Sequence, residues 1–411
     1  MGNWKTCTIG ELGTVIGGAT PSTKKAENYD GGTISWITPK DLAGFSGRFI
    51  SRGERNITEQ GLKSCSTQLM PARTVLFSSR APIGYVAIAA QEVCTNQGFK
   101  SVVPNESTDY MFLYYLLKYN RDKIENLGSG TTFKEVSGST MRGIEVTVPE
   151  TVEEQRRIAS VLSALDDKIE KNMEVNKNLE AQAQSIFKSW FIDAPESSSW
   201  ETGTFSDIID TMIAGDWGKD SPLGNNTEMV YCIRGADIPD VKSGNKGKMP
   251  TRFILPKNYV AKHLVAGDVV VEISGGSPTQ STGRIASISQ SLLDRYDKGM
   301  VCTNFCKAMK PKSGYSMFVY YYWQYLYDKN VFFLYENGTT GIKNLDISGF
   351  IETEPIILPP VELVEKFDAF CHSVFDVIFA NGLQNEKLAN MRDALLPKLM
   401  SGEIDASDLD L

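Results

Sequence analysis

Few side chains in this sequence have the type and spacing that acid–base or metal chemistry requires. The chain contains two histidines, His263 and His372, which excludes a histidine-rich metal site and a pair of imidazoles that exchange protons. Cys302 and Cys306 would need two further ligands to hold zinc, and the sequence offers no second Cys/His pair at a suitable spacing. We therefore expect no metal site and no catalytic residue in this chain.

The motifs that bind nucleotide cofactors are also missing. The stretch 244–248 (GNKGK) has neither the spacing nor the hydroxyl residue of a phosphate-binding loop, and no Gly-x-Gly-x-x-Gly opens a helix after an expected strand. The stretch 239–242 (PDVK) is too compressed to supply the carboxylate–lysine site of a nuclease. We expect the chain to bind no cofactor of its own.

Length and composition indicate a folded protein of several domains. A chain of 411 residues predicts about two to three domains, and its hydrophobic share of 41% and charged share of 22% are typical of globular proteins. The sequence has no apolar run of about 18 residues and does not begin like a signal peptide, which predicts a cytoplasmic protein without a membrane span. Seven scattered cysteines indicate reduced thiols.

The sequence repeats itself at a distance of about 200 residues. Trp4-x-Thr6-x-Thr8 recurs 196 positions later at Trp200, and Cys94-Thr95-Asn96 recurs 208 positions later at Cys302. This period is too long for one layer of a solenoid, so each repeat should be a domain with an appendage. Short apolar runs broken by Gly, Pro and Asn predict strands in the globular parts, and the aromatic stretches at 111–124 and 317–330 predict one core helix in each.

The appendages are predicted to be two long helices. Apolar residues keep a seven-residue spacing from about 152 to 191, a Thr151-x-x-Glu154 capping box precedes the first helix, and Pro360 is expected in the first turn of the second. One row of the first helix includes Asn172, and the other includes Asn176 and Trp190. Asn381 and Asn385 take the same places in the second helix, 209 positions later.

Asparagine in an apolar seam lowers stability but fixes the register of two helices. Antiparallel packing predicts that Asn172 faces Asn385 and that Asn176 faces Asn381, whereas parallel packing would pair Asn172 with Asn381. The expected fold is therefore α+β, with two mixed domains joined by two long antiparallel coiled-coil helices in a pseudo-twofold internal repeat. The expected segments are a first globular domain (1–150), a first spacer helix (151–195), a second globular domain (196–358), and a second spacer helix with an acidic tail (359–411).

Several segments of this architecture are similar to those of one protein family. They are IGGATPST (16–23), VLFSSRAPIGYVAIA (75–89), CTNQGFK (94–100), PETVEEQRRIASVLSALDDKIE (149–170) and LLPKLMSGEI (395–404). Over nearly the whole chain, the sequence resembles the specificity subunit of Type I DNA restriction–modification systems. The second repeat departs from this pattern at GDWGKDSPLG (215–224) and in the longer loop SGGSPTQSTG (274–283).

The resemblance implies a non-catalytic subunit that reads DNA. Each globular part would be a target recognition domain for one half of a bipartite double-stranded site. The resemblance also implies that the helices hold the halves apart and dock methylation subunits, two of them being expected. S-adenosylmethionine would be bound by those partners, and restriction subunits could join the complex. Two alternatives stay open at this point: a duplicated ligand-binding or structural protein unrelated to DNA, and a free-standing DNA-modifying enzyme.

The charge of the chain is unusual for a protein that binds DNA. The formal net charge is −8, but residues 1–150 have 16 basic and 14 acidic side chains, a net of +2, whereas residues 359–411 have 4 and 10, a net of −6. Basic loops, among them Arg48 with Arg52 and Arg55, could still neutralise phosphates locally. Arg, Lys and short polar side chains in glycine-rich loops are the residues that reach base edges and phosphates. The candidates are Thr20, Ser22, Lys24, Lys25, Lys40, Arg80 and Thr132 in the first repeat, and Lys219, Arg234, Lys246, Lys248, Gln280, Arg284, Thr340 and Lys343 in the second.

Overall fold

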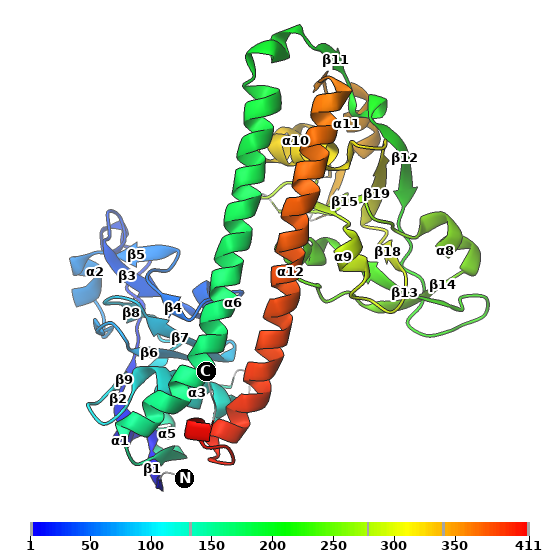
Figure 1. Cartoon of the computed structure of the whole chain (residues 1–411). Helices are drawn as coiled ribbons and strands as arrows, with labels where there is room; N and C mark the ends of the chain where they lie inside the picture. Colours follow the sequence, from blue (N-terminus) through cyan, green and yellow to red (C-terminus); the bar gives the residue numbers. More distant parts are fainter. Residues whose placement is uncertain (1–2, 131–133, 278, 339–341, 409–411) are drawn as a thin grey trace. The chain divides into compact units, whose positions relative to one another are not determined.

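The chain forms two compact units in a computed structural model that describes residues 3–130, 134–277, 279–338 and 342–408 (Figure 1). The first unit comprises Met1–Glu170 and Leu388–Leu411, and the second comprises Lys171–Lys387. The two long helices, α6 (Val152–Phe187) and α12 (Val361–Met400), therefore contribute one stretch each to both units. Thr132 and Thr340, two of the candidate DNA-binding residues, lie outside the described residues.

The first unit is built on three small sheets. A five-stranded sheet has the order β2-β9-β6-β7-β4, a three-stranded sheet has the order β5-β3-β8, and β1 pairs with β10. These strands are β1 (Trp4–Thr8), β2 (Gly13–Gly17), β3 (Ile34–Ile37), β4 (Phe49–Ile50), β5 (Arg55–Ile57), β6 (Val75–Ser79), β7 (Ile83–Ala89), β8 (Cys94–Thr95), β9 (Lys100–Pro104) and β10 (Glu145–Pro149). Its shorter helices are α1 (Ile9–Leu12), α2 (Glu59–Lys63), α3 (Tyr110–Tyr119), α4 (Arg121–Asn126) and α5 (Gly138–Gly143).

The second unit repeats this plan with an additional small sheet. Its sheets have the orders β12-β19-β15-β17, β14-β13-β18, β16-β21-β20 and β11-β22. The strands are β11 (Glu201–Gly203), β12 (Ile209–Ala214), β13 (Glu228–Ile233), β14 (Thr251–Ile254), β15 (Val269–Glu272), β16 (Ser274–Gly275), β17 (Ile285–Ser287), β18 (Met300–Cys302), β19 (Cys306–Pro311), β20 (Glu336–Asn337), β21 (Lys343–Leu345) and β22 (Ile356–Leu358). Its shorter helices are α7 (Ile238–Lys242), α8 (Pro256–Lys262), α9 (Gln290–Leu293), α10 (Ser316–Asp328) and α11 (Ile347–Thr353).

Corresponding strands pair in the same sense in the two units, as the internal repeat predicts. The three-stranded sheets each contain one parallel pair, β3 with β8 and β13 with β18. In both units, the first and last strands of the globular region form one antiparallel ladder, β1 with β10 and β11 with β22. The α+β fold with two long helices packed together is thus confirmed.

The aromatic stretches form the core helices that the sequence predicts. In the first unit, α3 buries Phe112, Tyr114 and Tyr115 against the large sheet. In the second unit, α10 buries residues from Ser316 to Trp323, and Phe318 packs on Phe187 of α6. These rings are buried in the core clusters of their units, so they are not a surface for stacking bases.

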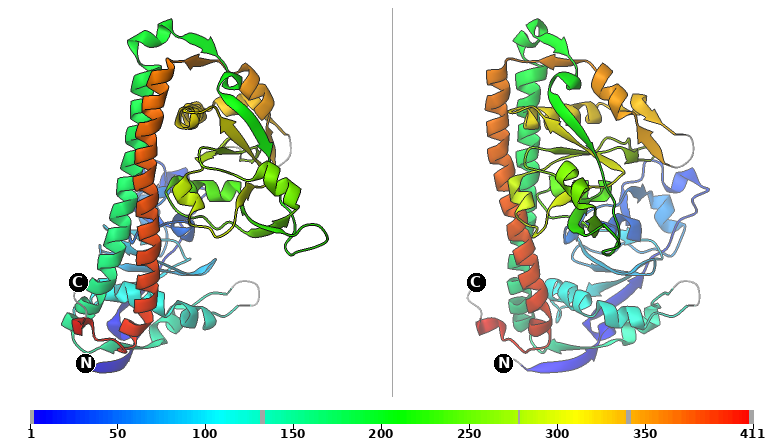
Figure 2. Two further views of the ribbon diagram at one scale, coloured as in Figure 1. Left: turned by 45° about the vertical axis from the view of Figure 1, so that its right-hand side comes forward. Right: turned by 90° about the vertical axis from the view of Figure 1, so that its right-hand side faces the viewer.

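Within the second unit, α6 and α12 are joined by a ladder of amides. Asn172 Nδ2 donates to Asn385 Oδ1 (2.8 Å), and Asn381 Nδ2 donates to Asn176 Oδ1 (2.8 Å). Positions rise along α6 as they fall along α12, so the helices are antiparallel, and the pairs are those that antiparallel packing requires (Figure 2). Asn176 Nδ2 also donates to the carbonyl of Ile378 (3.0 Å), which satisfies its amide inside the seam.

Within the first unit, the same two helices are joined by a buried ion pair. Arg392 of α12 donates to Asp166 of α6 (2.6 Å), and the hydroxyl of Tyr115 on α3 donates to the other carboxylate oxygen (2.6 Å). Burial and this anionic acceptor raise the pKa of Tyr115 well above its ordinary value. Three elements that lie far apart in sequence therefore meet at one carboxylate.

Two details of the helix prediction are wrong. Trp190 is exposed by 36%, whereas Phe187 and Phe191 are buried, in a stretch where the helix widens to a π-helical turn over Lys188–Ile192. The ring of Trp190 therefore lies at the edge of the seam, where its centre is 6.2 Å from that of Phe367 on α12. Pro360 does not lie in the first turn of α12: it precedes Val361, and its carbonyl accepts from the backbone N–H groups of Leu363 and Val364. Proline suits this place because no amide hydrogen is needed there.

A close approach between α12 and a loop makes Gly382 sensitive to substitution. A Cβ on Gly382 would overlap the carbonyl of Gly244, and Asn176 also donates to the carbonyl of Ser243 (3.1 Å) in this loop. Gly382→Ala is expected to lower the free energy of unfolding by about 1–3 kcal/mol, despite the higher helix propensity of alanine. Urea denaturation measures this loss. Ala380→Gly, at an exposed position of the same helix, is the control and should cost about 1 kcal/mol through propensity alone.

The seven cysteines are free, and five of them are buried, namely Cys94, Cys232, Cys302, Cys306 and Cys371. Burial raises the pKa of Cys94 and Cys232 to about 12 and that of Cys306 to about 11. Since the thiolate is the reactive form, these thiols should not react in the folded chain. A thiol-reactive chromophore at pH 8 is expected to titrate only the partly exposed Cys7 and Cys65 quickly, and all seven in urea. Fast reaction of any buried cysteine would contradict this burial.

Candidate nucleic-acid interface

In the first unit, three loops converge at one end of the sheets. Gly18 follows β2 and lies so close to the chain after β8 that a Cβ would overlap the carbonyl of Asn96. The N–H of Ala19 donates to the carbonyl of Thr95 (3.0 Å), and the hydroxyl of Thr20 donates to the side chain of Gln97. The loop after β6 joins them because the N–H of Ser79 donates to the carbonyl of Gly98 (2.7 Å). This set of contacts is called the loop junction below.

Charged side chains lie around the first loop junction. Arg80 and Lys100 approach the carboxylate of Glu135 at 3.5 and 3.2 Å. Lys40 is exposed and pairs with Glu54 at 2.6 Å. Thr20 and Arg80 are thus brought together by the fold, while Ser22, Lys24 and Lys25 are exposed on the adjacent loop before β3.

The second unit has an equivalent loop junction. Gly215 follows β12, a Cβ there would overlap the carbonyl of Thr303, and the N–H of Asp216 donates to the carbonyl of Cys302 (2.8 Å).

An aspartate-capped turn follows the parallel strand in both units. Asp41 accepts from the N–H of Thr38 (2.7 Å), and Asp237 accepts from the N–H of Arg234 (3.0 Å). The sequence repeat therefore reproduces backbone geometry and not only residue types.

Three candidate cations of the second unit are held by carboxylates. Arg234 donates to Asp237 (2.9 Å), Arg284 donates to both oxygens of the buried Glu272 (2.7 and 2.6 Å), and Lys343 pairs with Glu336 (2.7 Å). Hydrogen bonding to Glu272 and to Asp237 raises the pKa values of Arg284 and Arg234. A phosphate at any of these three side chains would have to compete with the carboxylate that the side chain already binds.

Arg48 is not the phosphate ligand that the basic loop suggested. It is buried, and its guanidinium donates to Asp167 and Glu170 of α6, with 3.0 Å between Nε and Oε1 of Glu170. It therefore attaches the first globular region to α6. Among the described residues, no carboxylate lies within 4.0 Å of the ammonium groups of Lys24, Lys219, Lys246 and Lys248, although the backbone N–H of Lys248 donates to Asp237 (3.0 Å). The ammonium of Lys246 lies 4.8 Å from the ring centre of Tyr296.

Two exposed aromatic side chains at the second loop junction were not predicted from the sequence. Trp217 is exposed by 38% and Phe305 by 58%. They line a hollow of about 520 Å³ together with Arg234, Glu272 and Asn304. The signal was present in the sequence, since Phe305 directly follows the repeated Cys-Thr-Asn, but an isolated aromatic in such a run is usually a core residue. The exposed residue Gln280 lies in the long loop 274–283, which follows Glu272 in the sequence.

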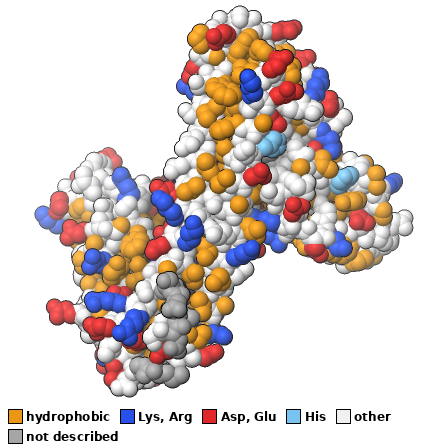
Figure 3. All heavy atoms as spheres, viewed as in Figure 1, with side chains coloured by type: hydrophobic (Ala, Val, Ile, Leu, Met, Phe, Trp, Pro, Cys, Tyr) orange, Lys and Arg blue, Asp and Glu red, His pale blue; other side chains and the backbone are white. Residues whose placement is uncertain are grey.

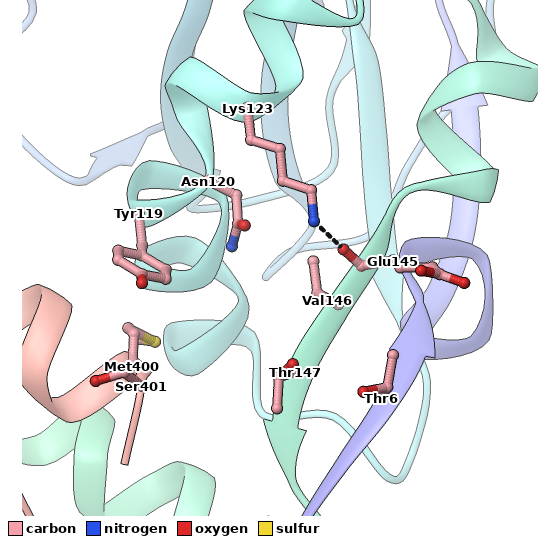
Figure 4. A pocket seen from close by; sticks show the side chains of 9 residues that line it. All are labelled: Thr6, Tyr119, Asn120, Lys123, Glu145, Val146, Thr147, Met400 and Ser401. Atoms are coloured by element: carbon pink, nitrogen blue, oxygen red, sulfur yellow. Dashed lines mark hydrogen bonds between the residues drawn. The ribbon is translucent and has the colours of Figure 1, made fainter. Parts of the chain in front are cut away.

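Another hollow, of about 620 Å³, lies in the first unit away from its loop junction (Figure 4). Thr6 and Thr147 line it from the paired strands β1 and β10, and Met400 lines it from the end of α12. The ammonium of Lys123 points into this space and donates to the carbonyl of Glu145 (2.7 Å). This hydrogen bond fixes the position of the ammonium group at the hollow.

Basic and acidic side chains are interspersed on the face that Figure 3 displays. No helix of the described chain is long and apolar enough to span a membrane. The described residues also contain no group of three or more His, Cys, Asp or Glu side chains placed to hold a metal ion.

Comparison with known proteins decides the family. Residues 1–181 match the family described as the Type I restriction modification DNA specificity domain. The chain is also 36% identical over 424 aligned positions to the Type I restriction enzyme MjaIX specificity subunit of Methanocaldococcus jannaschii, covering 99% of this chain and 95% of that protein. The chain belongs to the Type I restriction–modification specificity subunits. It is the DNA specificity subunit of such a system and has no catalytic role of its own.

Two further similarities agree with membership of the specificity subunits. The Type I restriction enzyme EcoR124I/EcoR124II specificity subunit of Escherichia coli is 30% identical over 173 residues, which is 40% of each chain. The crystal structure of the Type I restriction–modification S subunit from M. genitalium has the same fold, with a TM-score of 0.56 at 18% identity over 97% of this chain and 96% of that one. The resemblance seen in the sequence is thereby confirmed.

Proposed function

We propose that each globular region of this specificity subunit reads one half of a bipartite site in double-stranded DNA. The observation that carries the proposal is the duplicated loop junction, in which Gly18 and Gly215 hold equivalent loops against the Cys-Thr-Asn segments. The scaffold is the same in both units, but the side chains displayed on it differ. Two readers that share a backbone and differ in side chains recognise two different half-sites.

The two long helices act in this proposal as the spacer between half-sites and as the platform for methylation subunits. At 1.5 Å per residue, the 36 residues of α6 extend about 54 Å. Two exposed apolar side chains in a row on α12 support docking: Phe370 and Val377 are seven residues apart and exposed by 37% and 46%. Apolar side chains gather along the upper part of these helices in Figure 3, and patches of this kind mark interaction sites.

The proposal also includes the other components that the family resemblance implies. Two methylation subunits, one for each half-site, would bind S-adenosylmethionine and carry out the chemistry. Restriction subunits would join the same complex, and the assembly would act in the cytoplasm, where the DNA is. The net charge of −8 and the internally paired arginines predict weak DNA binding by the isolated subunit, with further phosphate contacts supplied by its partners.

The test is methylome sequencing of cells that carry the methylation subunit with wild-type or variant specificity subunits. Arg80→Ala changes the first loop junction, and Gln280→Ala changes an exposed side chain beside the second. Each is expected to relax the base preference at positions in one half of the site, and the two variants should affect different halves. Uniform loss of methylation at every site would indicate misfolding or a phosphate contact. A change of the same half by both variants would contradict the proposal.

A further inference from the structure

The two loop junctions carry opposite chemistry at equivalent positions. Thr20 lies two residues after Gly18, and Trp217 lies two residues after Gly215. Gln97 and Phe305 each follow the asparagine of the repeated Cys-Thr-Asn segment. In the first unit this pair is polar, and Thr20 donates to Gln97. In the second unit both members are aromatic and border one hollow. The duplicated scaffold therefore presents a hydrogen-bonding surface in one unit and an apolar surface in the other.

The aromatic pair of the second unit is held rigidly by its surroundings. The carbonyl of Phe305 accepts from the N–H groups of Ile273 (2.9 Å) and Ser274 (3.2 Å), which fixes its backbone while its ring stays 58% exposed. The guanidinium of Arg252 lies 4.1 Å from the ring centre of Trp217, and its Nε donates to the Trp217 carbonyl (2.8 Å). Because the backbone is fixed at the surface, the apolar area of these aromatic rings stays exposed to water. Contact with a ligand would bury this area, which is favourable.

The polar groups of this hollow are already occupied. Glu272 accepts two hydrogen bonds from Arg284, and Arg234 is bound by Asp237 and by the carbonyl of Lys248 (2.7 Å). A Cβ on Gly235 would overlap the Glu272 carboxylate, so Gly235 lets the backbone close over this pair. The chemistry that remains available in the hollow is mainly apolar contact with Trp217 and Phe305. The amide of Asn304, which is exposed, stands beside them.

In duplex DNA, the apolar group that a base edge presents in the major groove is the 5-methyl group of thymine. We propose that Phe305 and Trp217 form a pocket that selects a 5-methylpyrimidine, normally thymine, at one position of the half-site read by the second unit. This inference rests on the proposed function, because it assumes that the second unit reads its own half-site. Phe305 is the residue that contacts the methyl group, and Trp217 forms the opposing wall.

The test uses the complete methyltransferase, assembled from methylation subunits and this chain, on duplexes in which each thymine is replaced in turn by uracil. Uracil keeps the base pair and removes only the methyl group. Replacement at one position of the second half-site is expected to reduce the methylation rate at limiting enzyme about fourfold, the effect of one buried methyl group. Phe305→Ala should abolish this difference between thymine and uracil, and Phe305→Leu should preserve part of it.

Control experiments distinguish failure of this inference from failure of the proposed function on which it rests. Gln97→Ala, at the equivalent position of the first unit, should leave the uracil effect in the second half-site unchanged. A duplex with 5-methylcytosine opposite guanine at the sensitive position should be methylated faster than the same duplex with unmodified cytosine there. A second half-site without thymine on either strand, or a uracil effect that persists in Phe305→Ala, overturns the methyl-reading pocket. A Phe305→Ala variant that changes base preference in both halves refutes the division into half-sites instead.

Discussion

Replacing Phe370 and Val377 together with glutamate is expected to weaken binding of methylation subunits on the order of 100-fold. Both side chains are exposed on α12 and lie seven residues apart, so they face the same side of the helix. In an interface centred on this row, two carboxylates would lose water without gaining a partner. The double variant should therefore fail to co-purify with the methylation subunit, and methylation should be lost at every site whatever its sequence.

Size-exclusion chromatography and titration of the methylation subunit measure this effect. The matched control is Ala369→Glu, which adds a charge at the exposed position next to Phe370 but about 100° around the helix. The control should bind within about threefold of the wild type, since charges at the rim of an interface contribute little. Circular dichroism should be unchanged in all variants because the substituted side chains are exposed. Normal assembly of the double variant would show that the partner docks elsewhere.

Asp166→Ala is expected to lower the free energy of unfolding by about 3 kcal/mol. The Asp166 carboxylate is 6% exposed and accepts from Arg392 and from the Tyr115 hydroxyl, both at 2.6 Å. Its removal leaves a buried hydroxyl and a mostly buried guanidinium without their shared acceptor. Arg392 keeps its contact with the exposed Asp393 (2.7 Å), which limits the loss. The urea midpoint, followed by circular dichroism, measures the change.

Two further variants show whether charge burial is the cause. Asp393→Ala removes an exposed carboxylate and should cost less than about 1 kcal/mol. The double variant Asp166→Leu with Arg392→Met removes both buried charges and should recover much of the stability lost in Asp166→Ala, because a buried ion pair and an apolar pair of similar volume are often equivalent. Equal losses for Asp166→Ala and Asp393→Ala would mean that the buried pair has no special role.

The sequence alone predicted the features that depend on periodicity and repetition. The duplicated strands, the two core helices and the antiparallel register of Asn172 with Asn385 follow from spacing along one chain. The partners of charged residues could not be predicted in this way. Arg48 meets Glu170 across 122 positions and Arg392 meets Asp166 across 226. Such contacts depend on tertiary folding, and one of them pairs Arg48, a member of an apparently basic loop, with carboxylates of α6.

In the candidate site, too, some features could be predicted from the sequence and others depend on tertiary folding. The sequence indicated glycine-rich loops as elements of the candidate site, but their close approach at Gly18 and Gly215 became visible only in the structure. The side chains expected to be free for DNA were predicted less well, since Arg234 and Arg284 are bound by carboxylates. Phe305 was missed because residue type favours burial for phenylalanine, and its exposure results from the hydrogen bonds that hold its backbone at the surface.

The paired strands at the ends of each globular region have a consequence for evolution. Trp4 is opposite Pro149 in one ladder, and Glu201 is opposite Leu358 in the other, so each region begins and ends at neighbouring points beside a long helix. A gene segment cut at these ladders would encode an interchangeable cassette whose replacement leaves the helical frame intact. Bacterial or archaeal lineages could thereby acquire new site preferences by shuffling cassettes, without rebuilding the partners that the frame recruits.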